Sequence, residues 1–204
     1  MNDRPQAETE RQNALRRAAD FDRQRDQLRI DHAQDGLPAL TAAVRHLDRL
    51  TALLHSVSAE ILRRDTDRAS DPHLASSLRA YAETAEQAGR AVGHYSTAVG
   101  ELGFLHGVAA RQETQVLRDA RETAIAVVRE NAGQSANSLD AASTRLHNEA
   151  ARLKETDAQS VSRAARTRST HADHARGQAP AEVETHAEAP AQQPSHAPGA
   201  VRGR

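Results

Sequence analysis

Apolar side chains recur at helical spacing along most of the chain. Between residues 74 and 102 they alternate in steps of four and three without a gap. The row consists of Leu74, Leu78, Tyr81, Ala85, Ala88, Val92, Tyr95, Val99 and Leu102. This spacing is typical of a helix that packs along another helix. Its larger members form the predicted interaction seam: Leu74, Leu78, Tyr81, Val92, Tyr95, Val99 and Leu102.

An earlier stretch repeats the same steps and predicts a second long helix. The row consists of Leu40, Val44, Leu47, Thr51, Leu54, Ser58 and Ile61, and Leu50, Leu53 and Val57 widen it. Gly and Pro residues bracket this stretch, at positions that suit helix ends and first turns. We therefore predict breaks near residues 36–38 and 70–72.

Residues 1–35 are dense in charges of both signs and contain few apolar side chains, namely Leu15, Phe21, Leu28 and Ile30. Such a pattern predicts a charged N-terminal helix with a narrow contact stripe. A helix of this kind buries too little by itself, so we expect it to pack on the remainder of the chain.

The pattern weakens toward the C-terminus. Residues 131–138 combine poor helix formers with possible caps, so we predict a kink or short break there. Beyond residue 157 aliphatic side chains become scarce and Pro accumulates. We expect residues 158–204 to be a disordered tail, because they offer too little apolar surface to offset the entropy of ordering.

A second row, offset from the seam, contains small residues. This glycine stripe consists of Gly89, Gly93, Ser96, Gly100, Gly103 and Gly107. Each Gly inside a helix costs about 1 kcal/mol relative to Ala. Two interpretations remain open. Either another helix approaches the stripe closely, or residues 100–107 form a turn that ends one helix and starts the next.

Composition narrows the fold class. The chain has 204 residues, of which 41 are Ala and 2% are aromatic, so a thick core is not expected. We predict an all-α protein: an elongated antiparallel helical bundle or coiled coil of three to five long helices, with residues 36–157 as its main region. Thin helices with two apolar stripes bury more surface against a partner. A homo-oligomer or a helical protein partner is therefore expected.

Several chemistries are excluded or disfavoured by the residues present. The chain has no Cys, and its single lysine, Lys154, follows Leu153, so it lacks a phosphate-binding loop ending in Gly-Lys-Ser/Thr. The nearest approach to a metal motif, His171-Ala-Asp173-His174, lies in the expected tail, and Asp65-Thr-Asp67 lacks the remaining residues of a calcium loop. We predict no metal and no cofactor.

Carboxylates three residues apart also occur, as in Glu83 with Glu86 and Asp119 with Glu122. General acid–base chemistry needs such groups in a partly dry concave site, whereas a thin bundle offers solvated faces. We therefore predict a non-enzymatic protein that acts by homo-oligomerisation or protein–protein interaction.

Two alternative functions stay open. Residues 91–110 form a glycine-rich stretch that contains only one acid, Glu101, together with His94, and could associate with a membrane as a helical hairpin. Arg163, Arg166, Arg168 and Arg176 could add phosphate contacts in a DNA-associated accessory protein. The net charge of −1 disfavours a general nucleic-acid footprint. The charged start lacks an apolar signal segment, so we expect a cytoplasmic protein.

Overall fold

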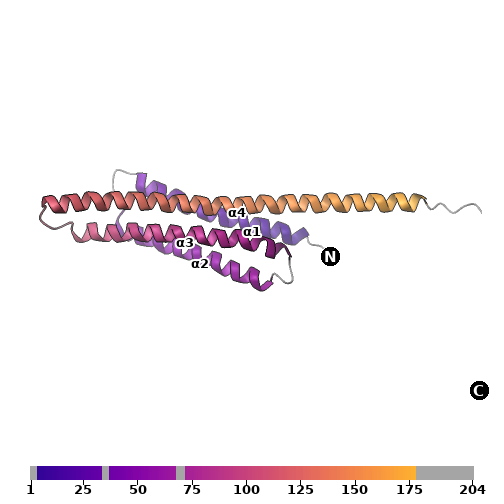
Figure 1. The fold of residues 1–204 in the computed structure, drawn as a ribbon, viewed down its shortest axis with the longest axis horizontal. Coiled ribbons are helices and arrows are strands. Elements are labelled where there is room, and N and C mark those ends of the chain that lie inside the picture. Colours follow the sequence, from indigo (N-terminus) through magenta and orange to yellow (C-terminus); the bar gives the residue numbers. More distant parts are fainter. Residues whose placement is uncertain (1–3, 34–36, 68–71, 178–204) are drawn as a thin grey trace, which may run out of the picture. The chain divides into compact units, whose positions relative to one another are not determined.

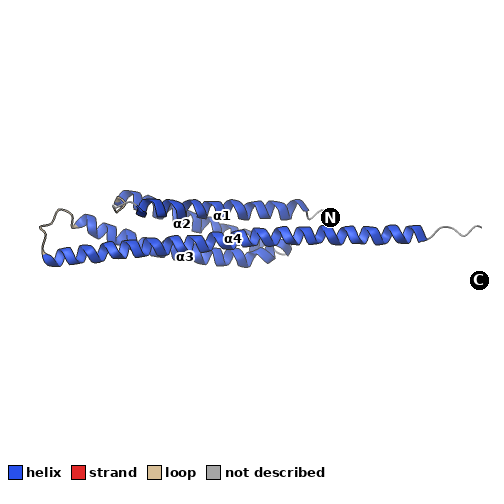
Figure 2. Ribbon diagram, turned by 90° about the horizontal axis from the view of Figure 1, so that it is seen from above, coloured by secondary structure: helices blue, strands red, loops and turns tan. Residues whose placement is uncertain are grey.

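The computed structural model describes residues 4–33, 37–67 and 72–177. Within these ranges the regular secondary structure is entirely α-helical, which confirms the predicted all-α class (Figures 1 and 2). The helices are α1 (Arg4–Ala33), α2 (Leu40–Asp67), α3 (Pro72–Gly107) and α4 (Gln115–Gly177). The chain divides into two compact units, residues 1–162 and 163–204, and the packing described below is that of the first unit.

Helix starts follow local chemistry. Pro72 is the first residue of α3, a position where its missing N–H costs nothing. Residues 37–39 are not helical, and the first backbone bond of α2 runs from the Ala43 N–H to the Ala39 carbonyl at 3.0 Å. Residues 34–36 and 68–71 lie outside the described residues. The predicted breaks near residues 36–38 and 70–72 therefore lie between the described helix ends, at Ala33 and Leu40 and at Asp67 and Pro72.

The turn between α3 and α4 comes later than the second interpretation of the glycine stripe placed it. Helix α3 continues through Gly100 and Gly103 and ends at Gly107, and residues 108–114 form the connection. Thr114 then caps α4, because its Oγ1 accepts a hydrogen bond from the Leu117 N–H at 3.2 Å. The glycines stay helical because the opposite side of α3 is packed, with Leu102 only 4% exposed.

Consecutive helices run in opposite directions, as the order of their contacts shows. Between α2 and α3, Arg64 meets Ser77 close to the short connection, and His46 meets Tyr95 much farther from it. Such an order arises only when the two helices are antiparallel. The contacts of α3 with α4 follow the same order (Figure 1).

One hydrophobic core unites residues from all four helices. Its fully buried large side chains include Phe21, Leu28, Leu50, Val57, Tyr81, Tyr95, Val128, Leu139 and Leu146. Alanines fill much of the remaining core. A core rich in Ala lets helix axes approach closely, which explains how a chain with so few large apolar residues can be enclosed.

The buried row of α3 is shifted relative to the predicted seam. It consists of Ser77, Tyr81, Thr84, Ala88, Ala91, Tyr95, Ala98 and Leu102. Leu78, Val92 and Val99 are half-buried beside it. Small side chains occupy the line of closest approach, and the larger aliphatic ones fill the flank. The buried row has the predicted spacing of four and three residues. Its position on the helix differs because the predicted seam was chosen from the larger apolar side chains.

Of the kink or short break predicted at residues 131–138, the break is absent, because α4 is helical throughout this segment. Its small residues face the core: Ala132, Ser135 and Ala136 are all buried. The Ser135 hydroxyl donates a hydrogen bond to the Ala91 carbonyl of α3 at 3.0 Å. Poor helix formers are stable here because their small size allows two backbones to approach, and tertiary packing outweighs propensity.

Helix α4 continues to Gly177, past the start of the predicted disordered tail at residue 158. Between residues 158 and 177 the chain is rich in Ala and Arg, both good helix formers, and the next Pro is Pro180. A helix already formed upstream elongates easily through such a sequence. Residues 178–204 lie outside the described residues.

Candidate interaction surface

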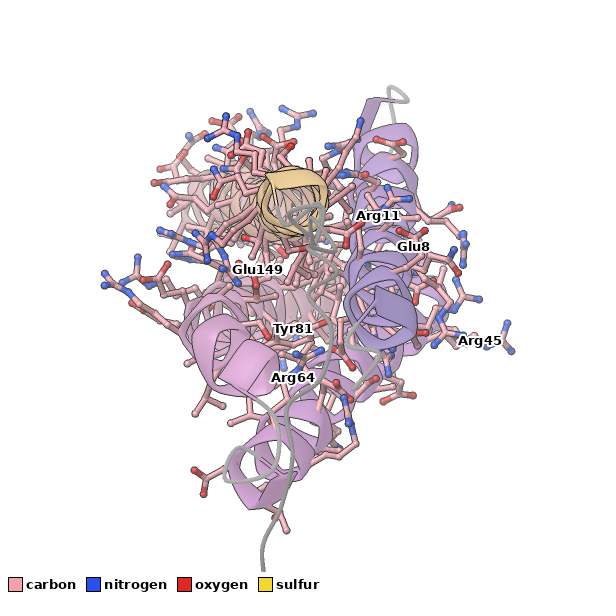
Figure 3. All side chains as sticks on the ribbon, turned by 90° about the vertical axis from the view of Figure 1, so that its right-hand side faces the viewer. Glu8, Arg11, Arg45, Arg64, Tyr81 and Glu149 are labelled. Atoms are coloured by element: carbon pink, nitrogen blue, oxygen red, sulfur yellow. The ribbon has the colours of Figure 1, made fainter. Side chains whose placement is uncertain are left out.

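A fully buried guanidinium lies where α1, α2 and α3 meet. Arg64, which is 0% exposed, forms an ion pair and hydrogen bond with Glu10 of α1. It donates to the Ser77 hydroxyl of α3 at 2.6 Å, and its Nε lies 3.0 Å from Oε1 of Glu60. The guanidinium carbon stands 3.9 Å from the centre of the Tyr81 ring (Figure 3). We name these five residues the Arg64 cluster.

The electrostatics of the Arg64 cluster follow from burial and ion pairing. Burial raises the pKa of the Tyr81 hydroxyl. Burial also acts to raise the pKa of Glu60, but hydrogen bonding to Arg63 and the charge of Arg64 outweigh it, so that the pKa is lowered. Glu60 therefore stays ionised beside a cation that solvent does not reach. Such an enclosed arrangement fixes helix register and offers no access to a substrate.

Three of the seven residues of the predicted interaction seam lie in the core of this chain. Tyr81, Tyr95 and Leu102 are buried, and the Tyr95 ring meets His46 edge-on, with centroids 5.1 Å apart. Leu78, Val92 and Val99 are half-buried, while the side chain of Leu74 lies outside the described part. The seam thus packs within the chain, and its use in binding a second chain stays a prediction.

The glycine stripe is open. A Cβ built on Gly89, Gly93, Gly100, Gly103 or Gly107 would meet no atom of the described structure within 4 Å. Ser96, its remaining member, is exposed. The stripe is therefore not where helices of this chain approach each other. That approach occurs at Ala91 and Ser135, on another side of α3.

Two aliphatic side chains of α2 are exposed. Leu62 is 69% exposed and Val44 is 41% exposed. Val44 and Leu62 lie roughly five turns apart on one side of α2, about 100° around the helix from Ser56 and Arg63, through which α1 makes contact. The glycine stripe lies on the flank of α3 that faces away from its α4 contact at Glu83. His46 meets Tyr95 whereas Arg64 meets Ser77, so Val44 lies level with the stripe and Leu62 lies beyond its Gly89 end. We name Val44, Leu62 and the glycine stripe together the open face, because nothing in the described structure covers them.

Sequence reasoning missed the buried polar residues of α2. His46 and Arg64 are 2% and 0% exposed, and they continue the buried row formed by Ala43, Leu50 and Val57. A signal was available, because these five positions follow helical spacing even though two of them are polar. The predicted row lies beside this buried row: Leu40, Leu47, Leu54 and Ile61 are partly buried and pack against the core, whereas Val44 is exposed.

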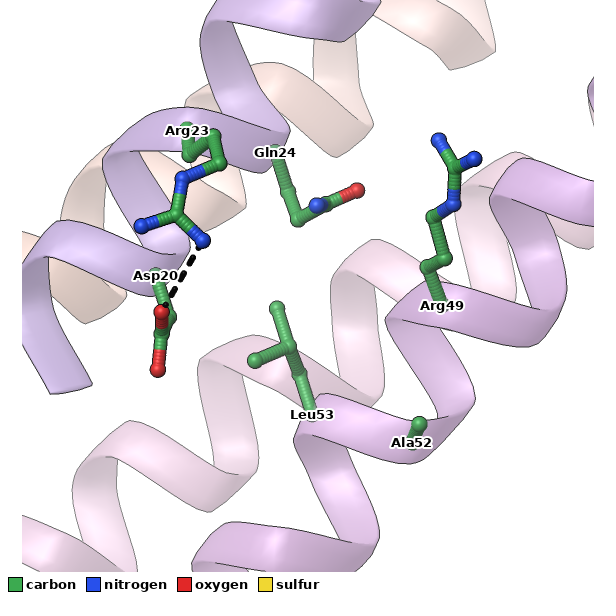
Figure 4. A pocket seen from close by; sticks show the side chains of 6 residues that line it. All are labelled: Asp20, Arg23, Gln24, Arg49, Ala52 and Leu53. Carbon is green, nitrogen blue, oxygen red and sulfur yellow. Dashed lines mark hydrogen bonds and ion pairs between the residues drawn. The ribbon is translucent and has the colours of Figure 1, made fainter.

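A shallow cleft of about 300 Å³ lies between α1 and α2 (Figure 4). Its lining residues are Asp20, Arg23, Gln24, Arg49, Ala52 and Leu53. Arg23 pairs with Asp20 at 3.3 Å, and both arginines of the cleft are exposed. Exposed arginines, one of them already paired, hold small anions weakly in water, so we assign no ligand to this cleft.

The predicted carboxylate pairs lie on helix surfaces. Glu83 forms ion pairs with Arg79 at 2.9 Å and with Arg145 at 2.5 Å. The hydrogen bond from Arg79 lowers the pKa of Glu83, with the charge of Arg145 adding to the effect. Glu86 pairs with Arg90 on the same helix. Carboxylates held ionised by arginine neighbours serve as structural partners and are poor proton donors.

The remaining candidates are distributed along α3 and α4. Glu101 and His94 are half-buried on α3. Arg163 and Arg166 are exposed on α4, while the side chains of Arg168 and Arg176 lie outside the described part. Among the described residues, no three potential ligands gather into a metal site, and none of the helices combines the length and apolarity needed to cross a membrane. The chain matches no known protein-family model, no curated protein and no solved structure.

Proposed function

We propose that this protein is a non-enzymatic helical bundle that acts by self-association, with the open face of α2 and α3 covered by a second copy of the chain. The carrying observation is the combination of exposed Val44 and Leu62 with a glycine stripe that nothing in the described structure covers. The proposal moves the interaction site from the predicted seam, which packs internally, to the neighbouring flank.

The energetic argument rests on the glycines. Four of them lie in the interior of α3, where each costs about 1 kcal/mol relative to Ala, and Gly107 is its last residue. Inside one chain nothing offsets this cost, because a Cβ at each position would enter open space. A helix laid along the stripe would approach the α3 backbone closely and gain dispersion contacts there. Covering Leu62 and Val44 would add the favourable burial of two aliphatic side chains.

We choose a second copy of the chain as the occupant of this face, because no other protein has to be assumed. The open face supplies both parts of a helical interface, namely projecting aliphatic side chains on α2 and a flat small-residue strip on α3. In a two-fold arrangement, the side chains of one copy can lie on the strip of the other. The antiparallel four-helix arrangement of each copy would then extend into a larger bundle or coiled coil.

The mass of the protein in solution tests this proposal. We expect light scattering on a sizing column to show a dimer whose population rises with protein concentration. Gly100→Leu, which fills the strip, should weaken the dimer by at least about tenfold because it prevents close approach. Gly133→Leu is the matched control, since Gly133 is also open but lies on α4 away from the open face. A wild-type monomer at all concentrations, or equal effects of both substitutions, would contradict the proposal.

A further inference from the structure

Helix α1 packs on the rest of the first unit with few large apolar side chains. Among its described side chains, Phe21 and Leu28 are the fully buried large ones, and small residues such as Ala14 and Ala18 occupy the rest of its contact row. Helix α4 by comparison buries Val128, Leu139, Leu146 and Leu153. The attachment of α1 therefore depends more strongly on its polar contacts.

Those polar contacts involve ionised side chains. In the N-terminal half of α1, Glu10 pairs with Arg64 and, at 3.3 Å, with Arg63. Arg17 donates a hydrogen bond to the Ser56 hydroxyl. Glu10 is 8% exposed, so its charge is held in place by the two guanidiniums of α2.

The second half of α1 is attached to α4 in the same manner. Arg25 forms an ion pair with Asp140 at 2.5 Å, and Asp22 lies 3.3 Å from Nε2 of His147. Partial burial acts to raise the pKa of Asp22, but hydrogen bonding to Ser143 and His147, together with the charge of Arg25, lowers it. The Asp22 carboxylate therefore stays ionised to lower pH than an ordinary carboxylate would.

We propose that α1 is an acid-releasable strap, which detaches from α2–α4 when the carboxylates around Arg64 are neutralised while α2–α4 stay packed. The release begins at the Glu10 end and uncovers the part of the core that Ala14 and Ala18 cover. It is a property of the first unit and does not depend on self-association through the open face.

The charged groups around Arg64 explain why acid detaches α1 and does not attach it more firmly. Its guanidinium keeps its charge at every relevant pH. Glu10 from α1 and Glu60 from α2 supply the compensating charges, whereas Ser77 and Tyr81 from α3 are neutral. Protonating the two carboxylates leaves a buried cation without a counter-charge, next to the positive Arg63. Such a cation draws water into the α1 interface.

The pH window follows from the sign of the shift. The pKa of Glu60 is lower in the folded chain than in an unfolded one, so its contribution is complete above the ordinary carboxylate range and is lost as the pH falls through the folded value. Release is therefore expected only below the ordinary carboxylate range. The pKa of Asp22, in the other half of α1, is also lowered, so its contacts with α4 persist and α1 opens first at its Glu10 end.

Distances between paired spin labels in the full chain test this proposal. The chain has no native Cys, so labels can be placed at exposed positions. Ala19→Cys with Ala59→Cys reports α1 against α2, and Ala59→Cys with Ala82→Cys reports α2 against α3. Between pH 7 and pH 3, we expect the first distance to lengthen and broaden while the second stays unchanged. If both distances change together, or neither changes, α1 is not separately releasable and the proposal is overturned.

Substitutions connect the release to Glu10. Glu10→Gln should raise the midpoint of release by at least about one pH unit, because it mimics protonation at neutral pH. Glu8→Gln is the matched control, since Glu8 lies on the same helix, pairs with Arg11 within α1 and is exposed (Figure 3). Glu10→Gln combined with Arg64→Met removes both charges and should keep α1 attached at pH 7. An equal shift in the Glu8 and Glu10 variants, or release in the double variant at pH 7, would overturn the assignment.

Discussion

Arg64 is the residue on which the polar packing of the first unit depends. Its side chain is enclosed by residues from three helices, and its partners come from positions as distant in sequence as Glu10 and Ser77. Taking a charge out of water is costly, so the cluster is stable only when its charges and hydrogen bonds are matched. This condition makes the cluster sensitive to any change that removes a single member.

Replacing Arg64 with Met tests this sensitivity. We expect the free energy of unfolding to fall by about 3–5 kcal/mol, because the carboxylates of Glu10 and Glu60 lose their buried partner. Chemical denaturation monitored by circular dichroism measures the change. Arg79→Met is the control, since the Arg79 side chain is 88% exposed and its pair with Glu83 is a surface pair, for which a loss below about 1 kcal/mol is expected. Similar losses in both variants would show that burial of Arg64 has no special role.

An exposed ion pair on α1 illustrates the opposite case. Hydrogen bonds from Arg11 and Gln12 lower the pKa of Glu8 to about 2. Glu8 is exposed, so solvent and salt screen this interaction and it adds little to folding. A strongly shifted pKa therefore does not by itself identify an important residue in this protein.

At the scale of helices, small residues decide which faces approach. The segment 131–138 looks weak by propensity, yet it contains the hydrogen bond from Ser135 to the Ala91 carbonyl. The glycine stripe of α3 looks suited to close packing, yet it is open. Both patterns are compatible with close approach, and the remaining contacts of α3 and α4 determine which of them is used within the chain.

Enlarging Ser135 tests the close approach of α3 and α4. We expect Ser135→Leu to lower the free energy of unfolding by about 1–3 kcal/mol or more, because the added atoms have no room between the two helices. Ser135→Ala should cost about 1 kcal/mol, the value of one hydrogen bond. Thermal unfolding of the purified variants provides the comparison. If Ser135→Leu is tolerated as well as Ser135→Ala, α3 and α4 are farther apart than described.

At the scale of the whole molecule, the chain consists of two compact units, residues 1–162 and 163–204. The core cluster lies entirely in the first unit, as do the Arg64 cluster and the open face. Arg163 and Arg166, by contrast, belong to the second unit. Stability and self-association should therefore be properties of the first unit alone.

Deleting residues 163–204 tests this division. We expect the thermal midpoint to change by less than about 2 °C, because no member of the core cluster is removed. The mass measured by light scattering should keep the same dependence on concentration. Differential scanning calorimetry of the full and shortened chains compares the midpoints directly. A large loss of stability would show that the second unit contributes to the core.

The sequence predicted the helical class and the division into long helices. Apolar spacing and the helix start at Pro72 depend only on residues close by in the chain. It predicted the spacing of the seam but not its register, since Ala91 and Val92 are equally compatible with a helix and only packing decides between them. His46 and Arg64 escaped prediction because their partners, Tyr95 and Glu10, come from other helices. The extension of α4 past residue 158 was missed because scarcity of apolar residues was equated with absence of structure.

The sequence by itself determined that this protein is all-α, because helical periodicity and the propensities of its many alanines depend only on neighbours along the chain. Only the tertiary structure decided that the predicted seam packs internally, that the glycine stripe stays open and that a buried arginine joins α1, α2 and α3. These outcomes depend on which flanks of different helices meet. That choice is set by the total packing of all four helices, and no single stretch of sequence contains it.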